Sequence, residues 1–141
     1  MAYATQDDMV RKFGSREVIA ITDRDRVGEI GVDVLAGALD GASGEIDTYL
    51  AARYRLPLSS VPRYLVDLCC DMARYHLVSA DARDTDEIRS RYNAAVKFLG
   101  YAADGKVTLG VDQAGATVQS GNTVQFDHGT RIFSSRDRGA Y

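Results

Sequence analysis

Apolar residues recur at helical spacing through three long stretches of the chain, and this periodicity limits the possible folds more than any other feature. The first stretch covers residues 33–54, the second follows Pro62, and the third ends near Ala103. Short polar or proline-containing connections join them, which favours antiparallel packing of neighbouring helices. We therefore expect a mainly α fold: a helical bundle of three long helices with a short N-terminal helix packed on it.

Each long helix is expected to bury one apolar stripe. In the first helix the stripe consists of Leu35, Ala38, Leu39, Ala42, Ile46, Tyr49, Leu50 and Tyr54. In the second helix it consists of Leu65, Leu68, Cys69, Met72, Ala73 and Leu77. In the third helix it consists of Ile88, Tyr92, Ala95, Val96 and Leu99. These three stripes are the predicted core.

Signals for helix ends separate these stretches. Pro57 ends the first long helix, because the residue before a proline is disfavoured in the helical region. Pro62 is suited to open the second helix. Asp84 and Glu87 have the spacing of a capping box before the third helix. The two interhelical connections are therefore expected to be tight or polar, as in an antiparallel bundle.

The N-terminal region is predicted to be less regular. Thr5 and Asp8 can cap a short helix that runs through Lys12, with Gly14 as its stop. Residues 15–32 contain further cap-like residues, but their glycines disfavour a continuous helix. We predict a turn of helix followed by a connecting loop in this segment.

The sequence changes character after Gly105. Lys106–Leu109 is strand-like, and residues 110–130 are rich in Gly, Thr, Gln, Ser and Asn. Residues 117–119 and 123–125 flank a Ser-Gly-Asn turn and are suited to a small hairpin, although an isolated hairpin is marginally stable. We therefore divide the chain into a helical bundle domain, 1–105, and an extended C-terminal tail, 106–141, with a hairpin as one form of the tail.

Three glycines lie three and four positions apart in the first long helix: Gly37, Gly41 and Gly44. Each costs about 1 kcal/mol relative to alanine unless something compensates for it. Close approach of another helix is the natural compensation. The crossing can be inside one chain or between subunits of an oligomer, and the sequence leaves both readings open.

The C-terminal end combines apolar and arginine residues. We expect a docking peptide that binds a partner protein through Arg131, Ile132, Phe133, Arg136, Arg138 and Tyr141. In this hypothesis the apolar side chains enter pockets and the arginines pair with acidic groups. The alternative is a loose terminus in which the aromatic residues have no role.

The sequence gives little support for catalysis or for cofactor and metal binding. His76 and His128 are the two histidines, and neither belongs to a known catalytic motif. Cys69 and Cys70 are neighbours that point about 100° apart on a helix, so they cannot share a metal ion and are read as buried hydrophobes. We expect a protein that is not an enzyme and has no cofactor.

Charge and hydropathy exclude two further classes. The net charge of -3 gives no general attraction to nucleic acid, so sequence-specific DNA binding is not expected. The apolar runs are too short to span a membrane. The N-terminus lacks the basic start and apolar core of a secretory signal, which predicts synthesis in the bacterial cytoplasm.

The order of the segments resembles the head-tail connector, or head-completion, proteins of Mu-like bacteriophages and prophages. The most specific parts of the resemblance are Glu45-Ile46-Asp47-Thr48-Tyr49-Leu50, Arg53-Tyr54-Arg55-Leu56-Pro57-Leu58, Cys69-Cys70-Asp71, Gly105-Lys106-Val107-Thr108-Leu109-Gly110 and the end of the chain. That family usually ends in a longer Arg-Asp-Ser-Leu-Arg-Gly-aromatic tail, whereas this chain reads Arg136-Asp137-Arg138-Gly139-Ala140-Tyr141.

The resemblance implies a structural subunit of the virion neck. Its expected partners are further copies of itself in a homo-oligomeric ring, the portal protein, and a tail-completion or stopper protein. Two other readings remain open: a small helical interaction or regulatory module that is not incorporated in the virion, and a metal-dependent nuclease with a site built from carboxylates. Presence in purified virions and metal-dependent stabilisation, respectively, would distinguish them.

Overall fold

Five α-helices make up the regular structure of the described residues, 2–79 and 85–111, in a computed structural model of the chain. They are α1 (Gln6–Phe13), α2 (Ser15–Thr22), α3 (Val32–Leu50), α4 (Arg63–Ser79) and α5 (Asp86–Ala103). Those two ranges contain no strand. The predicted mainly α fold is confirmed.

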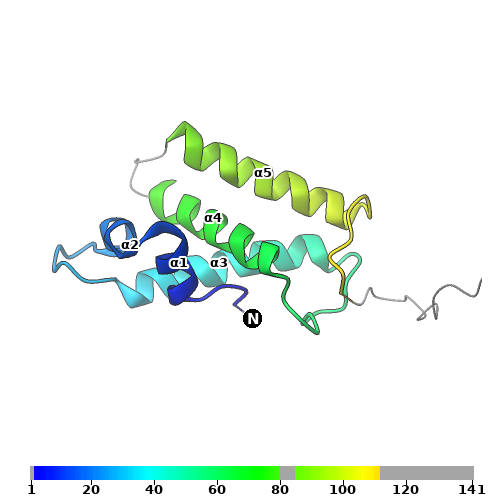
Figure 1. Ribbon diagram of the computed structural model, residues 1–141, viewed down its shortest axis with the longest axis horizontal. Coiled ribbons are helices and arrows are strands. Elements are labelled where there is room, and N and C mark those ends of the chain that lie inside the picture. Colours follow the sequence, from blue (N-terminus) through cyan, green and yellow to red (C-terminus); the bar gives the residue numbers. More distant parts are fainter. Residues whose placement is uncertain (1, 80–84, 112–141) are drawn as a thin grey trace, which may run out of the picture.

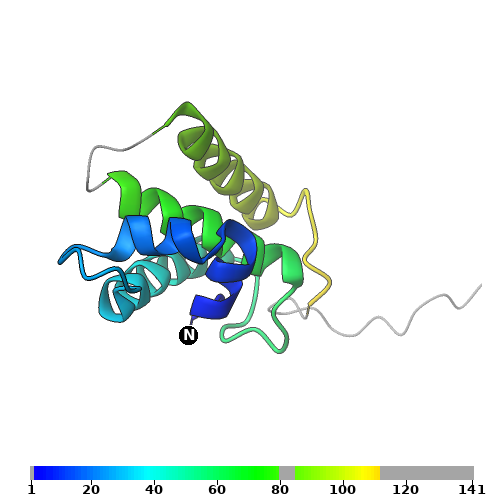
Figure 2. The ribbon, with the colours of Figure 1, turned by 60° about the vertical axis from the view of Figure 1, so that its left-hand side comes forward.

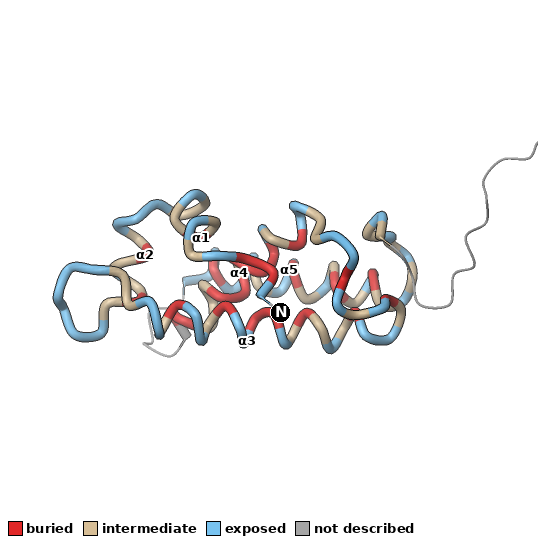
Figure 3. The backbone as a smooth tube through the Cα atoms, turned by 90° about the horizontal axis from the view of Figure 1, so that it is seen from below, coloured by how far each residue is buried: buried red, intermediate tan, exposed pale blue. Residues whose placement is uncertain are grey.

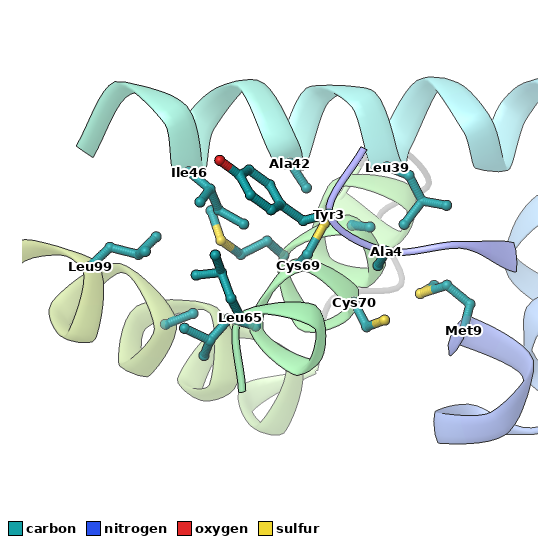
Figure 4. Packing of buried hydrophobic residues seen from close by; sticks show 14 of the residues in the cluster. Tyr3, Ala4, Met9, Leu39, Ala42, Ile46, Leu65, Cys69, Cys70 and Leu99 are labelled. Atoms are coloured by element: carbon teal, nitrogen blue, oxygen red, sulfur yellow. The ribbon is translucent and has the colours of Figure 1, made fainter. Parts of the chain in front are cut away.

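The three long helices pack against one another, and the two short helices cover one side of α4 (Figures 1 and 2). Residues of the predicted stripes form the core, including Leu39, Ile46, Leu65, Cys69 and Leu99, all at most 5% exposed. Figure 4 shows Ile46, Leu65 and Leu99 between the three long helices, and Leu39 beside Ala4 of the N-terminal segment. The helical periodicity therefore identified the buried faces of the bundle correctly.

The N-terminal region contains one helix more than expected. Thr5 and Asp8 form the predicted capping box of α1, and Gly14 ends that helix with a φ of 86°. The segment after Gly14 forms the eight-residue helix α2, where the sequence predicted only a turn of helix. The glycines that disfavoured a helix, Gly28 and Gly31, lie beyond its end, in the connecting loop. That loop is present as predicted.

Two predicted helix ends differ from the structure. The helix α3 ends at Leu50 rather than at Tyr54, because the chain turns there, and the N–H groups of Arg53 and Tyr54 both donate to the Leu50 carbonyl. The N-cap of α5 is Thr85, whose hydroxyl accepts from the Ile88 N–H, and not Asp84. A threonine beside an aspartate offers two capping choices one residue apart, and the sequence pattern did not separate them.

Residues 106–111 lie against the bundle. The N–H groups of Lys106 and Val107 donate to the Tyr101 carbonyl, and the Leu109 N–H donates to Tyr54 Oη at 3.1 Å. Leu109 and Val111 also pack on the core. The strand predicted for Lys106–Leu109 is wrong, because these backbone groups bond to the end of α5 and to Tyr54. The predicted hairpin at 117–125 lies outside the described residues.

Candidate interaction surfaces

The three glycines of α3 lie on an exposed face of the helix. A Cβ added at Gly37 or Gly44 would meet nothing within 4 Å, and one at Gly41 would meet only His76 Nδ1, at 3.7 Å. No described backbone therefore approaches these positions closely. Within residues 2–79 and 85–111, no helix crosses α3 tightly at these glycines, and the described residues leave their face of α3 exposed.

A shallow hollow of ≈ 320 Å³ adjoins this face at Gly37. Its walls come from the first half of α3, the end of α4 and the loop before α3, and its lining residues are Arg24, Asp33, Val34, Gly37, Ala38, His76 and Leu77. Its lining combines the apolar residues Val34, Ala38 and Leu77 with the polar side chains of Arg24, Asp33 and His76.

A polar cluster next to Gly41 links the three long helices through hydrogen bonds. Glu45 of α3 accepts a hydrogen bond from Tyr92 of α5 at 2.7 Å and pairs with His76 Nε2 of α4 at 3.1 Å. Tyr75 stacks on the Tyr92 ring with centroids 4.1 Å apart. The hydrogen bond to Glu45, together with burial, raises the pKa of Tyr92 to about 12. His76 therefore has a structural role through its contact with Glu45.

The two cysteines are buried, as predicted. Cys69 and Cys70 are 0% and 1% exposed, and burial raises the pKa of both thiols, that of Cys70 to about 12. Cys69 Sγ lies 3.5 Å from Ser43 Oγ. Within residues 2–79 and 85–111, no group of three His, Cys, Asp or Glu side chains is arranged to hold a metal ion.

Tyr3 is a core residue that the sequence reasoning missed. It is 5% exposed, its N–H donates to Ser43 Oγ at 3.0 Å, and its hydroxyl donates to Asp47. Figure 4 shows its ring between α3 and Cys69. Tyr3 precedes α1 and belongs to no periodic stripe, so helical periodicity could not reveal it. Its aromatic character was the only signal.

Aromatic side chains also gather where α4 begins and α5 ends. Tyr64 and Phe98 meet edge to face with centroids 4.7 Å apart. The ammonium groups of Lys97 and Lys106 lie 5.8 and 5.3 Å from the centre of the Tyr101 ring. This arrangement is a basic, aromatic surface, and sequence reasoning did not find it because its members come from different helices.

All of the predicted docking residues lie outside the described residues: Arg131, Ile132, Phe133, Arg136, Arg138 and Tyr141. Of the predicted interaction residues, the three glycines of α3 are therefore the ones whose surroundings are known.

A mainly helical bundle with an exposed glycine face on its first long helix is the class that these features define. The chain belongs to the bacteriophage Mu Gp36 family, whose sequence model matches residues 3–128. It is 34% identical over 142 residues to gene product J of Escherichia phage Mu, with 99% of each chain covered. It is 33% identical over 120 residues to the Mu-like prophage FluMu protein gp36 of Haemophilus influenzae, covering 85% of this chain and 84% of that protein.

The family assignment confirms that the chain is a Mu-like phage or prophage protein, as the sequence resemblance implied. Across the part of the chain that the structure describes, every helix is too short or too polar to cross a bilayer.

Proposed function

We propose that the protein is a structural, non-enzymatic subunit of the head-tail connector, located in the virion neck as a ring between the portal protein and a tail-completion or stopper protein. The observation that carries this proposal is the open glycine face of α3 in a Mu-family helical bundle. Gly37 and Gly44 have no close contact among the described residues, so nothing in that part of the chain compensates for their cost of about 1 kcal/mol each. Approach of a neighbouring subunit along Gly37, Gly41 and Gly44 would compensate for it.

In this proposal the end of the chain docks on a neighbouring neck protein. Ile132, Phe133 and Tyr141 enter apolar pockets, and Arg131, Arg136 and Arg138 pair with carboxylates. Ordering such a segment typically costs about 2–5 kcal/mol of the gross interaction energy. A single docking event is then weak, and the many copies of a ring make the joint strong through avidity.

The test is to mix the purified protein with portal rings from the same phage and to measure mass by light scattering and ring addition by negative-stain microscopy. We expect an additional ring on the portal. The matched variants are Gly37→Leu, which fills the open face, and Ala94→Leu, on the exposed part of α5. Gly37→Leu should weaken ring addition and Ala94→Leu should not.

A second measurement addresses the tail. Deletion of residues 128–141 should leave the helical bundle folded by circular dichroism and abolish head-tail joining in the phage. Normal phage yield from the deletion would contradict the docking role. Absence of the protein from purified virions, with no association with portal rings at any salt concentration, would instead favour a regulatory module outside the particle.

A further inference from the structure

Four large apolar side chains are exposed in the described part of the chain, and they lie at two places. Val27 and Val32, 71% and 59% exposed, flank the end of the loop that leads into α3. Tyr64 and Tyr101, 53% and 38% exposed, lie in the first turn of α4 and the last turn of α5. We call the first pair, with the charged residues of the loop, the loop patch. We call the second pair, with Phe98, Lys97 and Lys106, the helix-end patch.

The two patches are at opposite ends of the bundle. The loop before α3 lies at one end, and the start of α4 and the end of α5 lie at the other (Figures 1 and 3). The helix α3 spans the distance between the ends, and its 19 residues correspond to about 28 Å. One molecule therefore cannot bring its own two patches together.

Hydrogen bonds from the loop backbone to the side chains of Asp23 and Thr22 hold the loop patch in its conformation. The Asp23 carboxylate accepts hydrogen bonds from the N–H groups of Val27, at 3.0 Å, and Gly28, at 2.7 Å. The buried Thr22 hydroxyl accepts from the Gly31 N–H at 3.1 Å and donates to the Val18 carbonyl. An exposed valine on an ordered loop loses little conformational freedom when it is buried by a partner.

The helix-end patch and the loop patch both expose apolar side chains, and their charges are of opposite sign. Its aromatic rings offer a broad apolar surface for two valine side chains, and aromatic residues are the usual anchors of protein interfaces. Lys97 and Lys106 lie at its margin, and Lys106 also pairs with Asp104 at 3.0 Å, so the two lysines outnumber one carboxylate there. Residues 23–33 carry four carboxylates and two arginines, so the loop patch has an acidic balance. Opposite charges of this kind favour one mutual orientation.

We propose that copies of this chain associate head to tail, with the loop patch of one copy packed on the helix-end patch of the next. The proposal rests on the ring proposed above and gives its copies a second contact, at the ends of the bundle and separate from the glycine face of α3. Such a contact joins two different surfaces. A row of copies therefore keeps a free loop patch at one end and a free helix-end patch at the other, and the row can close into a ring when these two meet. Small interfaces are weak in pairs, and closure makes them strong together.

The test is sedimentation velocity of the full chain without portal, up to about 1 mM, so that even a millimolar dissociation constant is detected. Val27→Lys places a positive charge against the basic patch, and Tyr101→Ala removes an aromatic anchor. Each variant should raise the dissociation constant about tenfold or more. Ala94→Glu, in the exposed middle of α5, is the control and should leave association unchanged.

Mixing the two variants gives the decisive result. The Val27→Lys chain retains a helix-end patch and the Tyr101→Ala chain retains a loop patch, so the mixture should form one-to-one dimers that grow no further. Added salt should weaken these dimers, because the margins carry opposite charges.

Three results would overturn the proposal. The first is a full-length wild-type chain that remains monomeric, even if it associates after removal of residues 112–141. The others are variants that associate as strongly as wild type, and a mixture of the two variants that forms no heterodimer. The outcome is independent of the connector role. If the chain binds the portal and Val27→Lys does not change its self-association, this contact is rejected and the connector role stands. If the chain associates head to tail but does not bind the portal, the contact stands and the connector role is rejected.

Discussion

The hydroxyl of Tyr92 on α5 donates a 2.7 Å hydrogen bond to Glu45 on α3, and this bond joins two helices that are not adjacent in sequence. The same carboxylate is within 3.1 Å of His76 on α4. One partly buried glutamate therefore links all three long helices. Their relative positions depend on it as well as on apolar packing.

Tyr92→Phe is expected to destabilise the fold by about 1–2 kcal/mol, because a hydrogen bond to a charged group is lost while the ring and its stacking on Tyr75 remain. Urea unfolding measures the change. Tyr101→Phe, on the exposed end of α5, is the matched control and should change stability by less than about 0.5 kcal/mol. Equal effects of the two substitutions would contradict a structural role for the Tyr92 hydroxyl.

Stability is expected to fall in alkaline solution. The pKa of Tyr92 is raised from 10.0 to about 12, mainly by the hydrogen bond to Glu45, and burial raises the pKa of Tyr3. The folded state thus holds these phenolic protons more tightly than the unfolded state. The contribution is complete below pH 10 and is lost as pH rises through 12.

Urea midpoints measured from about pH 9 to about pH 12 test this dependence. Wild type should lose stability across the range, and Tyr92→Phe should lose less. Parallel curves for wild type and the variant would show that Tyr92 does not contribute.

Alanine at Gly37 or Gly44 should stabilise the free subunit by about 0.5–1 kcal/mol each, since the added methyl group meets open space and alanine is the better helix former. Gly31→Ala is the contrasting variant, because its Cβ would lie 2.4 Å from the Thr22 carbonyl oxygen. It should be destabilising. Thermal or urea unfolding distinguishes them, and destabilisation by Gly37→Ala would reveal a close neighbour at this face.

Lys12→Met should destabilise the attachment of α1 by about 1–3 kcal/mol. The Lys12 ammonium bonds to the Asp67 carbonyl at 2.6 Å and to Asp71 Oδ2 at 2.7 Å, and both charged side chains are less than one fifth exposed. Methionine preserves the aliphatic part and removes the charge. Arg11→Met is the control: its pair with Asp8 is on the surface, and its loss should cost less than about 0.5 kcal/mol in urea unfolding.

Helical periodicity predicted the part of the fold that depends on local repeats. The buried positions of α3 and α4, such as Ile46 and Met72, follow directly from their spacing. Tyr3 and Leu109 escaped this reasoning because they contact the bundle from segments without a repeat. Their partners, Ser43 and Tyr54, lie 40 and 55 residues away. A contact of that separation leaves no periodic trace in the sequence.

The candidate surfaces were predictable to a smaller extent. The spacing of Gly37, Gly41 and Gly44 identified an unusual helix face, but only the geometry of neighbouring atoms showed that none of the five described helices crosses it tightly. The role of Glu45 was not recognised either, because a carboxylate is normally solvated. Its burial depends on hydroxyl and imidazole groups from two other helices.

The hydrogen bond between Tyr54 and Leu109 sets a limit on the reach of the C-terminal end. Arg131 and Tyr141 follow Leu109 by 22 and 32 residues. A fully extended chain covers at most about 3.4 Å per residue, so these residues can touch a partner no further than roughly 75 and 110 Å from Tyr54. Any protein that receives the end of the chain must therefore lie within that radius of the end of the bundle at which α5 finishes. Deletions between residues 112 and 130 would shorten this distance in proportion. The shortest segment that still supports head-tail joining would therefore measure how far the partner lies from the bundle.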